Sequence, residues 1–415
     1  MLAADRETIR QKAAAMYDKD DISLHAVRNI MTRDFILGFL AFFVFFVANF
    51  TLTPTMPVYL KELGSNAREI GALVGILGIA SLFCRLLVGR ALRKYPEKRV
   101  MMFGAAMFAF TFLAFIVLRP FWPLLFVRFF QGVAFSCMDT AAIAYVVNVV
   151  PPVYRTRAIT YIFLAPCLAM AIAAPFGMFL MIRYSFMVLL LTGTALSACA
   201  FFFCLSLSGQ KTTAPGQESP ARNTFLFEWK IVVPAIASFL QYVVWSSVSA
   251  FFPLYAVQCG VTNPGLFFSA MAFMMIIGRI FGGKIFEMWR KEKIIVAFML
   301  VSMVALVTLS LSTTLPVFIV AGLLWGIAAA FVFPTCMAYA LEYSGTSGGT
   351  ALGTYQAFTD LGVALGPVIT GMIIPLTGYR AMFLCLASIC TLNLLYFQFY
   401  VSKGPNRTPA VQKIS

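Results

Sequence analysis

The chain has 415 residues, of which 61% are hydrophobic and 11% charged, and its mean hydropathy is +0.89. Soluble domains are about half apolar and about one quarter charged, so this composition excludes an ordinary soluble protein. The net charge of +15 does not indicate nucleic-acid binding, because the lysines and arginines lie between apolar segments. The single histidine, His25, precedes the first apolar segment, which excludes a histidine metal centre inside a membrane.

Twelve apolar segments are each long enough to cross about 30 Å of hydrocarbon as a helix. They lie near residues 35–58, 69–90, 100–118, 121–148, 158–182, 186–205, 231–256, 263–286, 293–312, 315–341, 352–376 and 381–401. A polar stretch rich in Ser, Gly and Pro separates the first six from the last six and indicates a flexible linker. We therefore predict an all-α integral membrane protein with a tail (1–33), a six-helix bundle (34–205), a linker (206–230), a second six-helix bundle (231–402) and a final tail (403–415).

The two predicted bundles share one sequence pattern. Arg85 is followed four residues later by Gly89, and Arg279 is followed in the same way by Gly283, with basic residues after each glycine. The two patterns lie 194 residues apart, the difference between positions 85 and 279, which is close to half of the chain. A long-period repeat between membrane-spanning segments indicates a transporter built of two pseudo-symmetric halves.

The lysines and arginines also predict the orientation. With both termini in the cytoplasm, 23 of them lie in cytoplasmic loops and tails and 5 in external loops. This asymmetry follows the positive-inside rule and predicts a multi-pass protein of the cytoplasmic (inner) membrane. The predicted partners are the lipid bilayer and a small-molecule substrate, with no nucleic acid and a monomeric state.

Ionisable side chains within the predicted helices are rare, and such residues are usually functional. From Arg128 to Asp139 there are eleven residues, which places both side chains on one helix face, about 16 Å apart, with Gln131 on the same stripe. We predict that this face lines the transport path. The alternative is a structural Arg128 that binds backbone carbonyls or neighbouring polar groups.

Two aspartates are candidates for carrying a proton. Burial favours the neutral form of a carboxylic acid, which suits Asp139 to this role, whereas a permanent ion pair with an arginine would prevent its titration. Asp360 lies about two turns from the cytoplasmic end of the helix predicted for 352–376. We predict that it bridges to Arg85 or to another basic group and stabilises the outward-open state, with proton carriage as the alternative.

Other polar side chains lie in the first and seventh predicted helices, which correspond in the repeat. Asn49 belongs to the first, and Gln241, Tyr242 and Trp245 cluster on about one turn of the seventh. Amide, hydroxyl and indole groups at the bilayer midplane can bind a polar substrate. Hydrogen bonding between helices is the alternative.

No phosphate-binding loop of the form G-x-x-x-x-G-K-[ST] occurs, so the sequence gives no support for ATP as the energy source. Nor does a catalytic constellation stand out. The predicted protein is therefore not an enzyme, needs no cofactor or metal, and uses an ion gradient, with protons as the predicted ion.

Several short motifs resemble those of the major facilitator superfamily. The segment from Gly89 to Arg99 is similar to the cytoplasmic loop signature G-x-L-x-D-R-x-G-R-R, and Arg128 to Gly132 resembles the motif R-x-x-Q-G. The segment from Gly362 to Gly371, which contains Gly366 and Pro367, resembles the glycine–proline antiporter motif, and Pro175 lies in a weaker equivalent. The resemblance covers residues 34–402 and is closest to proton-driven drug and sugar efflux permeases.

One departure from the family pattern concerns the cytoplasmic latch. The loop aspartate expected from the resemblance is replaced by Arg93, while Glu287 keeps an acid at the equivalent position of the second repeat. We therefore predict that the second half carries the latch. The predicted gating and structural residues are Arg85, Gly89, Arg93, Asp360, Arg279, Gly283, Glu287, Pro175, Gly366 and Pro367.

The sequence thus predicts a secondary active transporter that works by alternating access and exports a small organic solute in exchange for protons. Two alternatives stay open. One is an importer that takes up an organic anion together with protons, for which Arg128 would bind the anion. The other is a sensor or assembly partner that has the transporter fold without transport.

Overall fold

The structure is a computed structural model that describes residues 29–118, 121–209, 228–282, 285, 288–344 and 349–401. These residues form helices and include no strand. Among them, ten helices are long and apolar enough to cross a bilayer, and α10 is a shorter apolar helix. The prediction of an all-helical membrane fold is confirmed.

The helices fall into two sets, one on each side of residues 210–227. The first part of the chain holds α2 (Arg33–Glu62), α3 (Ala67–Lys94), α4 (Glu97–Val117), α5 (Phe121–Val149), η1 (Pro152–Tyr154), α6 (Arg155–Ile162), α7 (Leu164–Arg183) and α8 (Phe186–Leu205). The second part holds α9 (Trp229–Gln258), α10 (Gly265–Phe281), α12 (Lys291–Leu311), α13 (Leu315–Ser344), α14 (Gly349–Tyr396) and the π-helical η2 (Phe397–Val401).

Two elements differ from the sequence prediction. The single helix predicted for 158–182 is divided at Phe163, where α6 ends and α7 begins. The two helices predicted for 352–376 and 381–401 are joined in α14, although Gly378 lies between them with a left-handed φ of 78° that only glycine adopts easily. Because α10 has 17 residues and α14 counts once, length and composition alone give ten spans among the described helices rather than twelve.

The start of α3 is fixed by its first residues. The Asn66 side chain accepts the N–H of Glu69 at 2.9 Å, and the Glu69 carboxylate accepts the N–H of Asn66 at 3.0 Å. This reciprocal capping box satisfies two amide groups that would otherwise lack partners. It sets where α3 begins, and so which later residues of α3 face each neighbouring helix.

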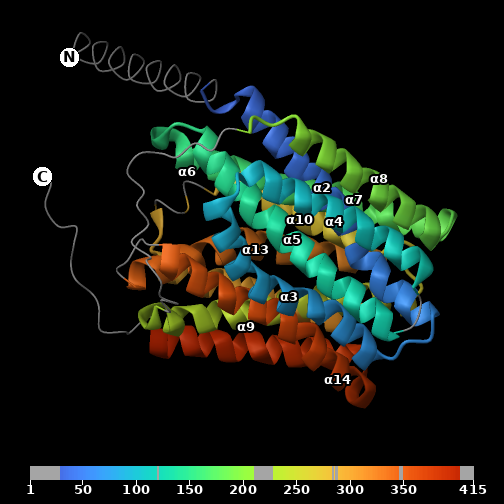
Figure 1. The fold of residues 1–415 in the computed structure, drawn as a ribbon. Helices are drawn as coiled ribbons and strands as arrows, with labels where there is room; N and C mark the ends of the chain where they lie inside the picture. The colour runs from blue at the N-terminus through green and yellow to red at the C-terminus, as the bar shows by residue number, and fades with distance from the viewer. Residues whose placement is uncertain are drawn as a thin grey trace, which may run out of the picture.

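Helices from the two parts of the chain pack mainly within their own part. The helices α2, α4, α5, α7 and α8 contact one another and α3, and α9, α12, α13 and α14 contact one another and α10. Figure 1 shows α2, α7 and α8 at one edge of the molecule and α9 and α14 at the other. The most extensive contacts between the parts lie between α3 and α14 and between α7 and α10, and smaller ones lie between α9 and both α2 and α3.

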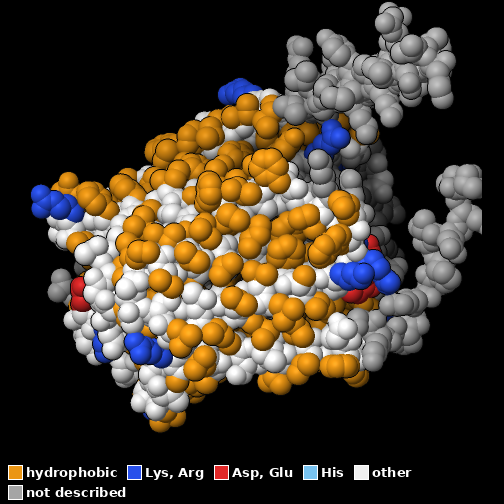
Figure 2. Space-filling view, turned by 180° about the vertical axis from the view of Figure 1, so that it is seen from behind, with side chains coloured by type: hydrophobic (Ala, Val, Ile, Leu, Met, Phe, Trp, Pro, Cys, Tyr) orange, Lys and Arg blue, Asp and Glu red, His pale blue; other side chains and the backbone are white. Residues whose placement is uncertain are grey.

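The outer surface is rich in apolar side chains. Phe110, Trp122 and Phe126 are 70%, 69% and 67% exposed. Figure 2 shows hydrophobic side chains spread over one whole face, with lysine and arginine at its margins. Water would disfavour such a surface, whereas hydrocarbon accepts it, so the exterior fits a lipid bilayer as its solvent.

Candidate functional site

A single arginine joins three helices inside the bundle. Arg85 of α3 donates from Nε to Asp360 Oδ2 at 2.7 Å and from Nη2 to Asp360 Oδ1 at 3.2 Å, on α14. Its Nη1 donates to Asp139 Oδ2 of α5 at 2.9 Å and to the Thr140 hydroxyl at 3.4 Å. The charged side chains are 12–15% exposed. We call Arg85, Asp139 and Asp360 the charged cluster.

Glycines on α3 bring α14 close enough for this pairing. A Cβ added at Gly71 would lie 2.3 Å from the Pro367 carbonyl oxygen, and one at Gly75 would lie 2.4 Å from the Ala364 carbonyl oxygen. Only residues without a side chain allow two helix backbones to approach so closely. We call this line of contact the α3–α14 seam, and Arg85 continues it along α3 to Asp360.

The approach of α5 to α3 has the same origin. A Cβ at Gly132 would lie 2.5 Å from the Leu77 carbonyl oxygen and 2.7 Å from the Ala80 side chain. Asp139 lies two helical turns further along α5, where α3 presents Arg85. The motif glycine at position 132 therefore positions the acid of α5 for its ion pair.

The charged cluster contains more negative than positive groups. Two carboxylates share one guanidinium, so the cluster carries one net negative charge when both aspartates are ionised. A carboxylate in hydrocarbon is costly unless it is paired or protonated. Binding of one proton would therefore neutralise the cluster without removing Arg85 from it.

Arg128 lies in a different environment on the same helix. Its side chain is buried, its Nε donates to the Leu73 carbonyl oxygen at 3.0 Å, and its Nη1 donates to Gln131 Oε1 at 2.6 Å. No carboxylate among the described residues pairs with it. The Gln131 Nε2 atom is buried without a hydrogen-bond partner.

The structure thus joins Arg128 to Gln131 but not to Asp139. Arg128 binds a backbone carbonyl, that of Leu73, as expected if its role is structural. Asp139 forms an ion pair with Arg85, which is the arrangement expected if Asp139 does not carry a proton. The bridge expected between Asp360 and Arg85 is present. Whether the Arg128–Asp139 face lines a transport path stays a prediction.

Among the candidates on α9, Tyr242 lies close enough to the charged cluster to interact electrostatically with Asp360 and Arg85. Tyr242 and Trp245 both pack against Phe333 of α13, with ring centroids 4.7 and 5.3 Å apart. Gln241 is buried and its Oε1 lacks a hydrogen-bond partner. Asn49 of α2 is half-buried, and its backbone carbonyl accepts the Thr53 hydroxyl.

Sequence reasoning missed several groups that complete these contacts. Thr140 contacts Arg85, the Leu73 carbonyl accepts from Arg128, and Phe333 holds the α9 aromatics. Tyr355, five residues before Asp360 in the chain, is buried, and its hydroxyl accepts a hydrogen bond from Ser238 at 2.9 Å. No spacing in the sequence marks these residues, because each acts through a neighbour on another helix.

Arg279, which corresponds to Arg85 in the repeat, also forms a hydrogen bond between the two parts of the chain. Arg279 of α10 donates from Nη1 to the Phe163 carbonyl oxygen at 2.6 Å, where α6 ends. At the opposite end of α10, the Asn263 amide donates to the Pro175 carbonyl at 3.2 Å. Arg85 thus binds two carboxylates, whereas Arg279 binds a backbone carbonyl. The equivalent arginines of the two parts therefore make chemically different contacts.

The remaining gating candidates have varied surroundings. A Cβ at Gly89 would meet no described atom within 4 Å, whereas one at Gly366 would lie 2.2 Å from the Ser246 hydroxyl of α9. Arg93 is exposed near the end of α3. Gly283 and Glu287 lie outside the described residues, so the latch predicted from Glu287 stays a prediction.

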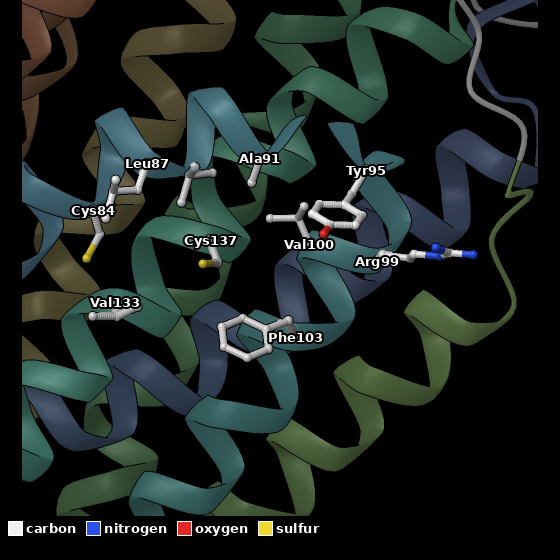
Figure 3. Close-up of a pocket in the computed structure, with 10 residues that line it drawn as sticks. Cys84, Leu87, Ala91, Tyr95, Arg99, Val100, Phe103, Val133 and Cys137 are labelled. Carbon is white, nitrogen blue, oxygen red and sulfur yellow. The ribbon is translucent and has the colours of Figure 1, made fainter. Parts of the chain in front are cut away.

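Two cavities are not lined by any residue of the charged cluster. One, of about 340 Å³, lies between α3, α4 and α5 (Figure 3), and one of about 620 Å³ lies beside Gly378. Neither is lined by Arg128, Gln241 or Trp245. The structure therefore does not gather the predicted binding residues around either cavity.

Comparison with known proteins gives a consistent result. The family model described as Major Facilitator Superfamily matches residues 38–348 and 293–414. The staphylopine export protein of Staphylococcus aureus is 22% identical over 400 residues, which cover 92% of this chain and 99% of that protein. The quinolone resistance protein NorA of Staphylococcus aureus is 24% identical over 350 residues, which cover 82% of this chain and 89% of that protein.

A similar fold occurs among solved structures. The crystal structure of the nucleoside transporter NupG superposes with a TM-score of 0.74 and 16% identity, over 88% of this chain and 98% of that one. At this identity the likeness concerns the fold alone. It extends over nearly all of the described helices.

Proposed function

Because the chain belongs to the Major Facilitator Superfamily and is therefore a transporter rather than an enzyme, we propose that it exports a small organic solute in exchange for protons by alternating access. The observation that carries this proposal is the charged cluster. It places two carboxylates and one guanidinium where helices of the two parts of the chain meet. Export is further supported by the two relatives that are named an export protein and a resistance protein.

The proposed coupling follows from the excess carboxylate. With both acids ionised, Arg85 holds α14 against α3 through Asp360. When a proton neutralises one carboxylate, the attraction across the α3–α14 seam weakens, and the transporter opens toward the cytoplasm. In the cytoplasm-facing state the solute binds and the proton is released. The ion pairs then form again and favour the state that is open to the outside.

The proposed topology has twelve crossings in two six-helix bundles with both termini in the cytoplasm. The left-handed Gly378 supports counting α14 as two crossings, and the apolar α10 supports one more beyond the ten long helices. The 23 to 5 distribution of basic residues supports the orientation and the cytoplasmic membrane. We propose a monomer that uses the proton gradient and no cofactor.

Flux measurements in oriented vesicles test this proposal. A growth screen of a deletion strain against toxic compounds supplies a transported compound. Inverted vesicles should accumulate that compound when their interior is made acidic, and a protonophore should abolish the accumulation. Right-side-out vesicles that accumulate it with an inward proton gradient would instead establish symport and uptake.

A second candidate function rests on Arg128. This buried cation contacts only a carbonyl and an amide among the described residues, and an unpaired charge in hydrocarbon is costly. A solute with a carboxylate or another acidic group would supply the missing negative charge. The importer of an organic anion, driven by proton symport, is therefore the alternative that vesicle flux decides.

A further inference from the structure

The cavity between α3, α4 and α5 has an apolar end and a basic end. Cys84 and Leu87 of α3 and Val133 and Cys137 of α5 line the apolar end. Tyr95 and Arg99, in the connection from α3 to α4 and the first turn of α4, line the other. Figure 3 shows the cavity running from Cys84 and Val133 at one end to Tyr95 and Arg99 at the other.

The apolar part of this cavity opens on the outer surface of the bundle. Leu87 is 58% exposed, and Tyr95 is 41% exposed. At the depth of a membrane-spanning helix, exposed leucine contacts lipid chains rather than water. The thiols of Cys84 and Cys137 are neutral, nearly buried and unbonded to each other, so they add no charge to the lining. The chemistry of this end suits a hydrocarbon chain.

The basic end has a cation available for an anion. Arg99 is exposed and forms no ion pair among the described residues. The neighbouring charges are already engaged: Glu97 accepts from the Asn148 amide at 2.6 Å, and Lys98 donates to two carbonyls at the end of α8, both at 2.7 Å. The residue before α4, Pro96, makes no side-chain cap, so the first amides of α4 also favour an anion.

We propose that this cavity binds one anionic phospholipid, with an acyl chain along the apolar end and the phosphate at Arg99 and the start of α4. The basic connection, which holds five lysines and arginines between residues 90 and 99, adds attraction at the membrane surface. The cytoplasmic leaflet is assigned through the orientation in the proposed function. The binding itself does not depend on transport or on proton coupling.

An acyl chain and a phosphate together explain both ends of the cavity. A neutral apolar solute would use only the lining and would be indifferent to Arg99. A soluble anion would use only Arg99 and would leave Cys84 and Cys137 open to reagents. These two occupants therefore predict different behaviour at named residues, and the cavity supplies its own reporters in the two cysteines.

Cysteine labelling in nanodiscs tests the proposal. The full-length protein is placed in discs of phosphatidylcholine with increasing phosphatidylglycerol and treated with a lipophilic maleimide, and each cysteine is read separately by mass spectrometry. Cys199 is exposed on α8 and controls for delivery of the reagent. Phosphatidylglycerol should slow the labelling of Cys84 and Cys137 severalfold and leave Cys199 unchanged.

Two variants separate the contribution of the cation. Arg99→Gln should need about fivefold more phosphatidylglycerol for the same protection, because one basic residue near an anionic surface contributes roughly that factor. Lys293→Gln is the matched control, since Lys293 is exposed, lies 194 residues after Arg99 in the repeat and lines no part of this cavity. It should require the wild-type amount.

Three results would overturn the proposal. The first is labelling of Cys84 and Cys137 that does not change with phosphatidylglycerol. The second is an equal response of Arg99→Gln and Lys293→Gln. The third is equal protection by soluble glycerol phosphate in discs without the anionic lipid. Failure of flux in vesicles would refute the proposed transport and leave this result intact, because the labelling measures binding without a gradient.

Discussion

Arg85 and Asp360 form a two-point ion pair across the α3–α14 seam, at 2.7 and 3.2 Å, although 275 residues separate them in the chain. The same guanidinium reaches Asp139 on α5. One side chain therefore links a helix of the second part of the chain to two helices of the first. Any movement that separates α3 from α14 must break this pair, which leaves Asp360 in hydrocarbon without its cation unless the acid is protonated.

Replacement of Arg85 should strongly destabilise the protein. Arg85→Gln leaves Asp139 and Asp360 close together without a cation, and breaking a buried pair costs about 3–5 kcal/mol. The 12–15% exposure of the side chains places the expected loss in the free energy of unfolding toward the lower end of that range. Thermal unfolding of the purified variant measures the loss.

The double variant Arg85→Gln with Asp360→Asn separates charge from packing. Neutralising one carboxylate should recover roughly half or more of the lost stability, because the remaining repulsion disappears. A double variant that is as unstable as Arg85→Gln alone would show that Arg85 acts through packing and not through its charge.

The close approach of α3 and α14 should depend on glycine at position 75. A valine there would bring Cβ to 2.4 Å from the Ala364 carbonyl oxygen, so the helices must move apart. We expect Gly75→Val to lower the free energy of unfolding by about 1–3 kcal/mol. Gly89→Ala is the control, because its added Cβ meets no described atom within 4 Å, and it should leave stability unchanged or slightly higher. Equal unfolding temperatures for both variants would contradict the seam.

Removal of the Arg128 charge should abolish transport without lowering the stability of the protein appreciably. Arg128→Gln takes away a buried cation that has no carboxylate partner among the described residues, so its stability should stay within about 1 kcal/mol of wild type or rise. Transport of the compound found by the growth screen should be lost if Arg128 binds the solute. Loss of stability with residual transport would assign Arg128 to the packing of α3 on α5.

Sequence alone predicted the fold and part of the charged cluster, for separate physical reasons. Apolar runs of spanning length define membrane helices directly, and the family resemblance drawn from the Gly89–Arg99 and Arg128–Gly132 motifs is confirmed by the family model. Because ionised groups in hydrocarbon need partners, the sequence predicted a bridge from Asp360 to Arg85 or to another basic group, and the structure contains the pair with Arg85.

Other features could not be predicted, because they depend on which helices meet. Helical spacing placed Arg128 and Asp139 on one face, but α3 presents a carbonyl to the first and Arg85 to the second. The break at Phe163 is marked by Pro166 in the first turn of α7, whose ring and missing N–H disfavour a continuous helix. The contact between the Phe163 carbonyl and Arg279 has no such mark in the sequence. Periodicity describes one helix at a time and contains no information on the neighbour.

The most direct test of the central claim measures the α3–α14 distance as a function of pH, without a substrate. Spin labels are attached at Gly89→Cys on α3 and Gly353→Cys on α14, because a Cβ added at either glycine would meet no described atom within 4 Å. Pulsed electron paramagnetic resonance then reports the distance between the ends of these two helices near the charged cluster. A background without the nine native cysteines keeps labelling specific. On acidification from about pH 8 to about pH 5, protonation of the cluster should shift the population toward longer distances. Asp360→Asn, which mimics the protonated acid, should show the long distances at every pH. A wild-type distribution that does not change with pH, or an Asp360→Asn variant that responds like wild type, would contradict proton control of the seam.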